Sequence, residues 1–356
     1  MKKIILFSCL CLFVAAFSCN PSGTKDKKET AATATLNDDS LIKVAHTYFK
    51  VLPAVADNKN NPVTQAKADL GKMLYYDTRL SLNGNNSCNS CHNLATFGVD
   101  NEATSKGDAG KRGNRNSPTV FNAALHNMQF WDGRARDVEE QAGGPILNSI
   151  EMGMPHKNVV IERLAAVRQY QEKFKQAFPN EAKPISYDNL QKAIGAFERT
   201  LLTPSRFDQY IQGNKNALTA EEKAGLMSFV GAGCTTCHNG VGVGGGMMQR
   251  FGLVTDYRSF THSKVNDEGR KSITRFASDK DVFKVPGLRN ISETYPYFHD
   301  GSVAELDSAV TIMAKAQLNR NLSKQELKQI GAFLNSLTGQ VNPQAKRIPS
   351  ELQKEL

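Results

Sequence analysis

Two pentapeptides of the pattern Cys-x-x-Cys-His constrain this chain more than any other feature. They are residues 88–92 (CNSCH) and residues 234–238 (CTTCH). The pattern is typical of covalent c-type haem, in which two thiols bond to the porphyrin and the histidine binds the iron. The sequence therefore predicts two haem c groups. Their cofactor-binding residues are Cys88, Cys91 and His92 for the first, and Cys234, Cys237 and His238 for the second.

Other uses of paired cysteines fit less well. A zinc site would need a second Cys or His pair near each motif. A thioredoxin-like pair would need a βαβ pattern, whereas the flanking segments have helical periodicity. Disulfide bonds are open to an exported protein, but they would not explain why histidine follows both pairs.

The N-terminus resembles an export signal. Residues 1–18 combine an early positive charge with a short apolar stretch, and small residues precede Cys19. That ending is typical of a lipoprotein signal, which predicts a periplasmic protein with possible membrane attachment through lipidated Cys19. An ordinary secretory signal, with Cys19 incidental, is the alternative. Residues 19–55 are expected to form a flexible tether and lead-in.

The formal net charge is +9. A basic surface of this kind can steer an acidic partner. There is no block of basic residues of the sort that binds nucleic acid, so no nucleic-acid partner is expected.

Apolar periodicity and capping pairs predict helices joined by long loops rich in glycine and asparagine. Helices are expected over 64–76 and 187–201, and a last helix should end near Gly339. Ser or Thr followed three residues later by Glu predicts further helix starts. These capping pairs are Thr219 with Glu222, Ser302 with Glu305, and Ser323 with Glu326.

The fold class is therefore mostly α, with two cytochrome c-like helical domains that each carry one covalent haem. The predicted N-terminal haem domain spans 56–203, and the C-terminal electron-transfer domain spans 204–340. The tail 341–356 is expected to pack on the first domain.

Several short segments, in order, resemble the bacterial di-haem cytochrome c peroxidases from about residue 60 to 340. They are 115–122 (RNSPTVFN), 130–135 (FWDGRA), 151–153 (EMG), 266–270 (NDEGR), 285–290 (VPGLRN), 294–301 (TYPYFHDG) and 316–318 (AQL).

The resemblance implies a role for several residues. His92 would be the proximal ligand of the low-potential haem where peroxide binds, and Glu151 the acid/base beside that iron. His238 and Met313 would hold the high-potential haem, since a thioether favours Fe(II). Trp131 would aid electron transfer between the haems. Without the resemblance, Glu151 would be read as a surface residue and Met313 as core packing.

The resemblance also implies one calcium ion, a homodimer and a small electron donor. Asn116, Thr294 and Pro296 match positions that bind calcium in this family, two of them through backbone carbonyls. The donor would be a reduced soluble cytochrome c or a cupredoxin.

One departure from the family concerns the peroxide site. Well-known members have a histidine sixteen residues after the first proximal histidine, where it caps the iron of the resting enzyme. Here that position is Asp108, in a loop that Gly107 and Gly110 are expected to make flexible. The next histidine is His126, beyond the RNSPTVFN segment. The first haem is therefore expected to be five-coordinate or water-bound.

The sequence thus favours a di-haem peroxidase that reduces hydrogen peroxide to water. One alternative is a MauG-like oxidase that modifies a protein; known relatives of that kind replace the ligand methionine with tyrosine, so Met313 argues against it. The other is a pure electron carrier with two six-coordinate haems, against which Glu151 and Asp108 argue.

Overall fold

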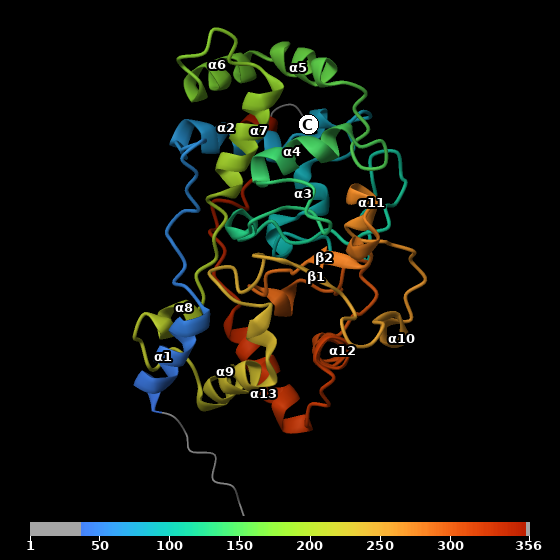
Figure 1. Ribbon diagram of the computed structural model, residues 1–356. Helices are drawn as coiled ribbons and strands as arrows, with labels where there is room; N and C mark the ends of the chain where they lie inside the picture. The colour runs from blue at the N-terminus through green and yellow to red at the C-terminus, as the bar shows by residue number, and fades with distance from the viewer. Residues whose placement is uncertain (1–36, 354–356) are drawn as a thin grey trace, which may run out of the picture. The chain divides into compact units, whose positions relative to one another are not determined.

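The computed structural model describes residues 37–353; the predicted export signal and Cys19 lie outside this range. The described chain consists of helices and long loops with one small antiparallel sheet (Figure 1), which confirms the mostly α class. The helices are α1 Asp38–Tyr48, α2 Gln65–Tyr76, α3 Cys88–Cys91, α4 Val138–Leu147, α5 Lys157–Ala165, α6 Arg168–Ala177, α7 Tyr187–Glu198, α8 Arg206–Ile211, α9 Ala220–Ala232, α10 Arg258–Thr261, α11 Lys271–Thr274, α12 Leu306–Leu318, α13 Lys324–Ser336 and α14 Ser350–Gln353. The strands are β1 Met248–Arg250 and β2 Val282–Lys284. Within residues 37–353, no helix is long and apolar enough to span a membrane.

The first hydrophobic cluster forms where α2 crosses α7, with α4 packed beside them (Figure 1). The crossing is close because α2 presents Gly71. A Cβ at Gly71 would lie 1.9 Å from the carbonyl oxygen of Ala193 and 2.9 Å from the Cβ of Phe197. Fully buried residues at helical spacing fill the contact. They include Leu70, Leu74, Leu190 and Ile194.

The second hydrophobic cluster forms where α9 crosses α13 (Figure 1). Here Gly225 makes the close approach. A Cβ at this position would lie 1.9 Å from the carbonyl oxygen of Gln329 and 2.9 Å from the Cβ of Phe333. The ring of Phe207 meets those of Phe333 and Phe49 edge-on, each at a centroid distance of 5.3 Å. Aromatic pairs in this geometry add to the stabilisation from apolar burial.

Part of the predicted tether is ordered structure. Residues 38–48 form helix α1, whereas 19–55 was expected to be a flexible lead-in. Asn37 caps the helix by accepting the N–H of Ser40 at 2.9 Å. Leu41, Ala45 and Phe49 lie one helical turn apart and are buried in the second cluster. Apolar spacing over three turns, combined with a good cap, therefore outweighs the polar composition of this segment.

The predicted helix starts are mostly confirmed. Thr64 accepts the N–H of Lys67, and complete capping boxes open α9 and α13. The prediction at Ser302 is wrong, because α12 begins at Leu306 without a side-chain cap. Val303 instead pairs with Tyr297, whose N–H donates to the Val303 carbonyl at 2.6 Å. This pairing keeps the chain extended where the capping turn would have to form.

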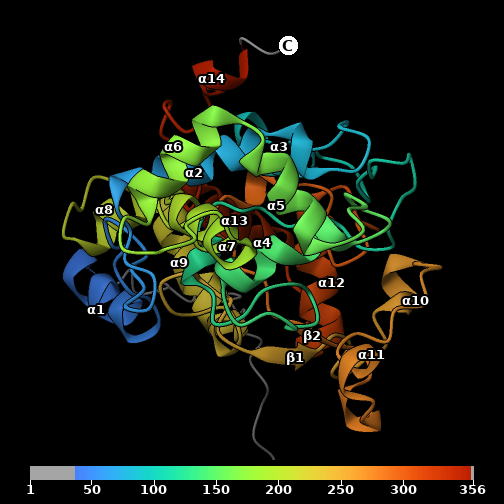
Figure 2. The ribbon, with the colours of Figure 1, turned by 90° about the horizontal axis from the view of Figure 1, so that it is seen from above.

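The C-terminal tail lies against the first cluster. Ala345 and Leu352 belong to that cluster, and α14 lies beside α2 (Figure 2). The hydroxyl of Tyr76 donates to the carbonyl of Ala345 at 2.9 Å. The chain from Asn37 onward forms one compact unit, so a domain boundary near residue 204 stays a prediction.

The close crossing of α9 and α13 can be tested with two glycines of the same helix. Gly225→Ala should destabilise the protein by about 1–3 kcal/mol, because the added methyl must displace the backbone at Gln329. Gly231→Ala is the matched control: nothing lies within 4 Å of its Cβ position, so alanine should stabilise by about 0.5–1 kcal/mol. Thermal unfolding followed by circular dichroism measures both; equal effects would contradict the assigned crossing.

Candidate functional site

The first Cys-x-x-Cys-His motif forms one tight turn. The backbone N–H of His92 donates to the carbonyl of Cys88 at 2.9 Å, and the hydroxyl of Tyr75 donates to the carbonyl of His92 at 2.5 Å. Nδ1 of His92 lies 2.9 Å from the carbonyl oxygen of Pro118. A carbonyl can only accept, so Nδ1 carries the proton and Nε2 has the free lone pair that a metal requires.

The second motif repeats this turn at the end of α9. Gly233 ends the helix with φ +92°, and a short 3-10 turn over Cys234–Thr236 follows. The N–H of His238 donates to the carbonyl of Cys234 at 2.9 Å, as its counterpart does in the first motif. His238 is only 8% exposed. Burial lowers the pKa of its imidazole to about 4, so the ring is neutral and suited to bind a metal.

A cavity of about 230 Å³ adjoins the second motif, and the residues around it fit a haem. Cys234, Cys237 and His238 line it together with Met313. One stripe of α12 faces this cavity, at the spacing of successive helical turns. The stripe consists of Leu306, Ala309, Val310, Met313, Ala314 and Gln317. The donors that c-type attachment requires, and a thioether that can serve as a second axial ligand, therefore share one largely apolar cavity.

Glu151 lies in the loop after α4, close enough to Cys91 for its charge to act on that residue. Its Oε1 accepts a hydrogen bond from Nδ2 of Asn148 at 2.9 Å. Burial raises the pKa of Glu151, and the positive charge of Arg134 offsets part of this rise. A carboxyl group whose pKa is raised is protonated more readily than an ordinary one, which suits it to general acid–base chemistry.

Asp108 is held by several hydrogen bonds. Its carboxylate accepts hydrogen bonds from the N–H groups of Asn83 and Asn85 and from the Asn83 amide, at 2.7–2.9 Å. Its own N–H donates to the carbonyl of Glu151 at 2.7 Å. Burial alone would raise the pKa of Asp108, but the hydrogen bonds outweigh it and lower that pKa.

Gly107 serves a close approach beside Asp108. A Cβ at this glycine would lie 1.7 Å from the carbonyl oxygen of Ile150. Glycine is therefore required for the packing of this loop against the residues that precede Glu151, and its presence does not indicate mobility.

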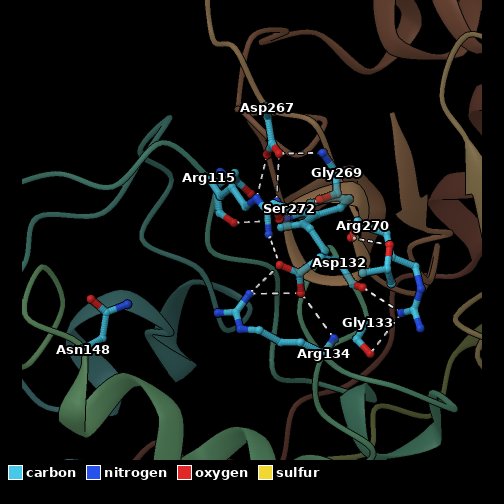
Figure 3. Close-up of polar contacts among 12 residues, drawn as sticks. Arg115, Asp132, Gly133, Arg134, Asn148, Asp267, Gly269, Arg270 and Ser272 are labelled. Atoms are coloured by element: carbon cyan, nitrogen blue, oxygen red, sulfur yellow. Dashed lines mark hydrogen bonds and ion pairs between the residues drawn. The ribbon is translucent and has the colours of Figure 1, made fainter. Parts of the chain in front are cut away.

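Arg115 connects two loops that are distant in sequence (Figure 3). Its Nη1 donates to Asp132 at 2.5 Å, while Nε and Nη2 donate to the two oxygens of Asp267 at 2.6 and 2.8 Å. Arg134 also donates to Asp132, at 2.8 Å. Bidentate arginine–carboxylate pairs of this kind are strong and fix orientation. Because Asp132 follows Trp131 directly, the cluster fixes the backbone at Trp131.

Trp131 and the three residues expected at a calcium site line the same cavity as His238. The indole Nε1 of Trp131 donates to the carbonyl of Asn116 at 2.9 Å. Thr294 and Pro296 lie on the loop that precedes His299, whose carbonyl accepts the N–H of Asn116 at 2.7 Å. In the described part of the chain, no group of three or more His, Cys, Asp or Glu is arranged to hold a metal.

The structure also brings into this cavity polar residues that the sequence did not single out. Lys284 and His126 contact each other there, although they are far apart in the chain. The Arg115 cluster likewise depends on Asp267 from a distant loop. No local sequence pattern predicts such pairs, because neither residue of a pair belongs to a recognisable motif. The pairs become visible only when the folded structure brings the two segments of the chain together.

Comparison with known proteins agrees with this geometry. The family model described as "Di-haem cytochrome c peroxidase" matches residues 65–216. Cytochrome c551 peroxidase of Pseudomonas aeruginosa is 44% identical over 310 residues, 86% of this chain and 89% of that protein. The protein of the same name from Nitrosomonas europaea is 47% identical over 279 residues, 78% of this chain and 81% of that protein.

A solved structure shows the same architecture. The crystal structure of a MauG-like protein associated with microbial copper homeostasis has a TM-score of 0.75 and 30% sequence identity. The match covers 84% of this chain and 97% of that one. The chain thus belongs to the di-haem cytochrome c peroxidase family.

Proposed function

We propose that this protein reduces hydrogen peroxide to water with electrons from a reduced cytochrome c or a similar small carrier. The observation that carries the proposal is Glu151, a half-buried carboxyl group whose charge acts on Cys91 of the first haem motif and whose pKa is raised by burial. A carboxyl group in this state can accept a proton from one peroxide oxygen and return it to the leaving one. A protein that only carries electrons does not require such an acid–base group.

The haem-binding roles follow from the two motifs. We assign Cys88 and Cys91 to covalent attachment of the first haem, with His92 as its axial ligand. Cys234 and Cys237 would attach the second haem, and His238 and Met313 would bind its iron; all four residues line one cavity. The bound haems supply redox-active iron for the two one-electron transfers that the reduction of peroxide requires.

Trp131 and the calcium residues are assigned with support from the shared cavity. Trp131 lines the cavity of His238 and is hydrogen-bonded to Asn116, which suits a role in electron transfer between the sites. We propose one calcium ion at Asn116, Thr294 and Pro296, whose amide and carbonyl oxygens are the donors that calcium prefers. All three residues line that cavity.

Met313 separates this activity from protein oxidation by a MauG-like enzyme. In the resemblance stated above, enzymes of that kind carry tyrosine at the ligand position, whereas Met313 provides a thioether that lines the cavity. The signal-like N-terminal sequence supports export to the periplasm and attachment through Cys19, and the family resemblance supports a homodimer. The net charge of +9 suits an acidic electron donor, which can be a soluble cytochrome c or a cupredoxin.

Replacement of Glu151 tests the central proposal. Glu151→Gln retains the size of the side chain and removes the acid–base group, so peroxide turnover with reduced cytochrome c should fall by roughly 10² or more. Glu162→Gln, on the exposed face of α5, is the matched control and should retain wild-type turnover. Mass spectrometry should show two haems in each variant. A near-normal rate for Glu151→Gln would remove this residue from the mechanism.

Replacement of Met313 tests the second site separately. Met313→His should strongly lower the midpoint potential of the haem at His238, because imidazole favours Fe(III) more than a thioether does. Spectroelectrochemical titration measures this potential. If it does not change, Met313 is a packing residue of α12.

The coordination of the first haem in the resting enzyme follows from Asp108. Its carboxylate is committed to Asn83 and Asn85, so it is not available as an iron ligand. We therefore expect a high-spin signal from the haem at His92 in the oxidised protein, by electron paramagnetic resonance. The oxidised enzyme should accept peroxide without prior reduction. Low-spin signals from both haems, with activity only after one-electron reduction, would refute this expectation.

A further inference from the structure

Lys284 is a buried lysine without a carboxylate partner. It ends strand β2 and is 5% exposed. Its backbone N–H donates to the carbonyl of Trp131 at 2.7 Å, which fixes the backbone beside the cavity. Among residues 37–353, the one side-chain partner of its ammonium group is Nδ1 of His126, at 3.3 Å. An ammonium group can donate three hydrogen bonds, so two of these have no protein acceptor.

His126 cannot neutralise this charge. Burial, followed by the positive charge of Lys284, lowers the pKa of His126 well below its ordinary value, so the imidazole is neutral. The ring is also fixed in position by three glycines, at positions 242, 245 and 287. A Cβ at Gly245 would lie 2.1 Å from Cδ2 of His126, and one at Gly287 would lie 2.6 Å from its Nε2. The imidazole is therefore a rigid, neutral acceptor that directs the ammonium group.

No anionic side chain of the described residues lines the cavity. Of the described residues that line it, none is Asp, Glu or Arg, and Lys284 is the one lysine. Burying an unpaired ammonium group is costly, and burial lowers the pKa of Lys284 to about 8. The same cavity is lined by Cys234, Cys237 and His238. A group that completes this cavity should therefore bring a negative charge to Lys284.

The porphyrin of a c-type haem carries two propionate groups, which are carboxylates. We propose that Lys284 is the counter-ion of one propionate of the haem attached at Cys234 and Cys237, and that His126 orients its ammonium group. The proposal rests on the haem assignment made under the proposed function. It makes Lys284 a positioning residue that also raises the potential of this haem, since a nearby positive charge favours the reduced iron.

Removal of the charge is the direct test. In holoprotein with two haems, Lys284→Met should lower the midpoint potential of the haem at His238 and shift the propionate bending mode in its resonance Raman spectrum. Lys284→Arg keeps the charge and should remain close to wild type in both. Lys280→Met removes the same charge from an exposed position just before β2, and should change neither.

The outcomes separate this proposal from the haem assignment. A Lys284→Met protein with two haems, an unchanged potential and an unchanged propionate mode would overturn the proposal while leaving the haem assignment intact. Wild-type protein without covalent haem would overturn the assignment itself. If the Lys284→Met protein matures with only one haem, the Lys284→Gln variant tests whether the lost charge is the cause. Loss of the second haem in Lys284→Gln but not in Lys284→Arg supports a counter-ion, whereas retention in Lys284→Gln overturns it.

Discussion

The two close helix crossings are the constraint on which the haem motifs depend. In each crossing, a Cβ added at a glycine would lie 1.9 Å from a backbone carbonyl oxygen of the partner helix. The same Cβ would lie 2.9 Å from the Cβ of the phenylalanine that follows that carbonyl residue by four positions. Gly71 meets Ala193 and Phe197 in this way, and Gly225 meets Gln329 and Phe333. The same geometry in both halves supports an internal duplication. In the chain, each Cys-x-x-Cys-His turn comes after the first helix of one of these pairs, and it packs against that helix.

Local features of the sequence predicted local features of the structure. The capping boxes at Thr219 and Ser323 involve residues three positions apart, so short-range chemistry decides them. The box expected at Ser302 failed because Val303 pairs with Tyr297, which a capping rule does not consider. The fold class and the motif turns were predictable because helices and turns depend on residues close in sequence. The positions of the loops were not predictable, because they depend on residues that are close only in space.

The loop around Asp108 shows that the glycine content of a segment does not predict its contacts. Glycine-rich sequence suggested mobility, yet Gly107 is required for contact with the carbonyl of Ile150, and Asp108 binds Asn83, Asn85 and the backbone of Glu151. These contacts come from three separate segments, so no single stretch predicts them. The contact between Lys284 and His126 could not be predicted from the sequence either. Each is an isolated basic residue in sequence, and the contact between them exists only after the loops have packed.

The two haem motifs are alike, but an acidic residue lies near the first and a basic residue lies beside the second. Near the first motif, Glu151 has a raised pKa because burial disfavours its anion. Beside the second, the cavity has Lys284 and no carboxylate among its described lining residues, so negative charge is stabilised there. The first environment supports the proposed proton transfer, and the second supports the proposed stabilisation of reduced iron. Both groups come from outside the motifs and the helix crossings. The two halves of this chain thus share a glycine helix crossing and differ in the loop and strand residues that lie beside each haem motif.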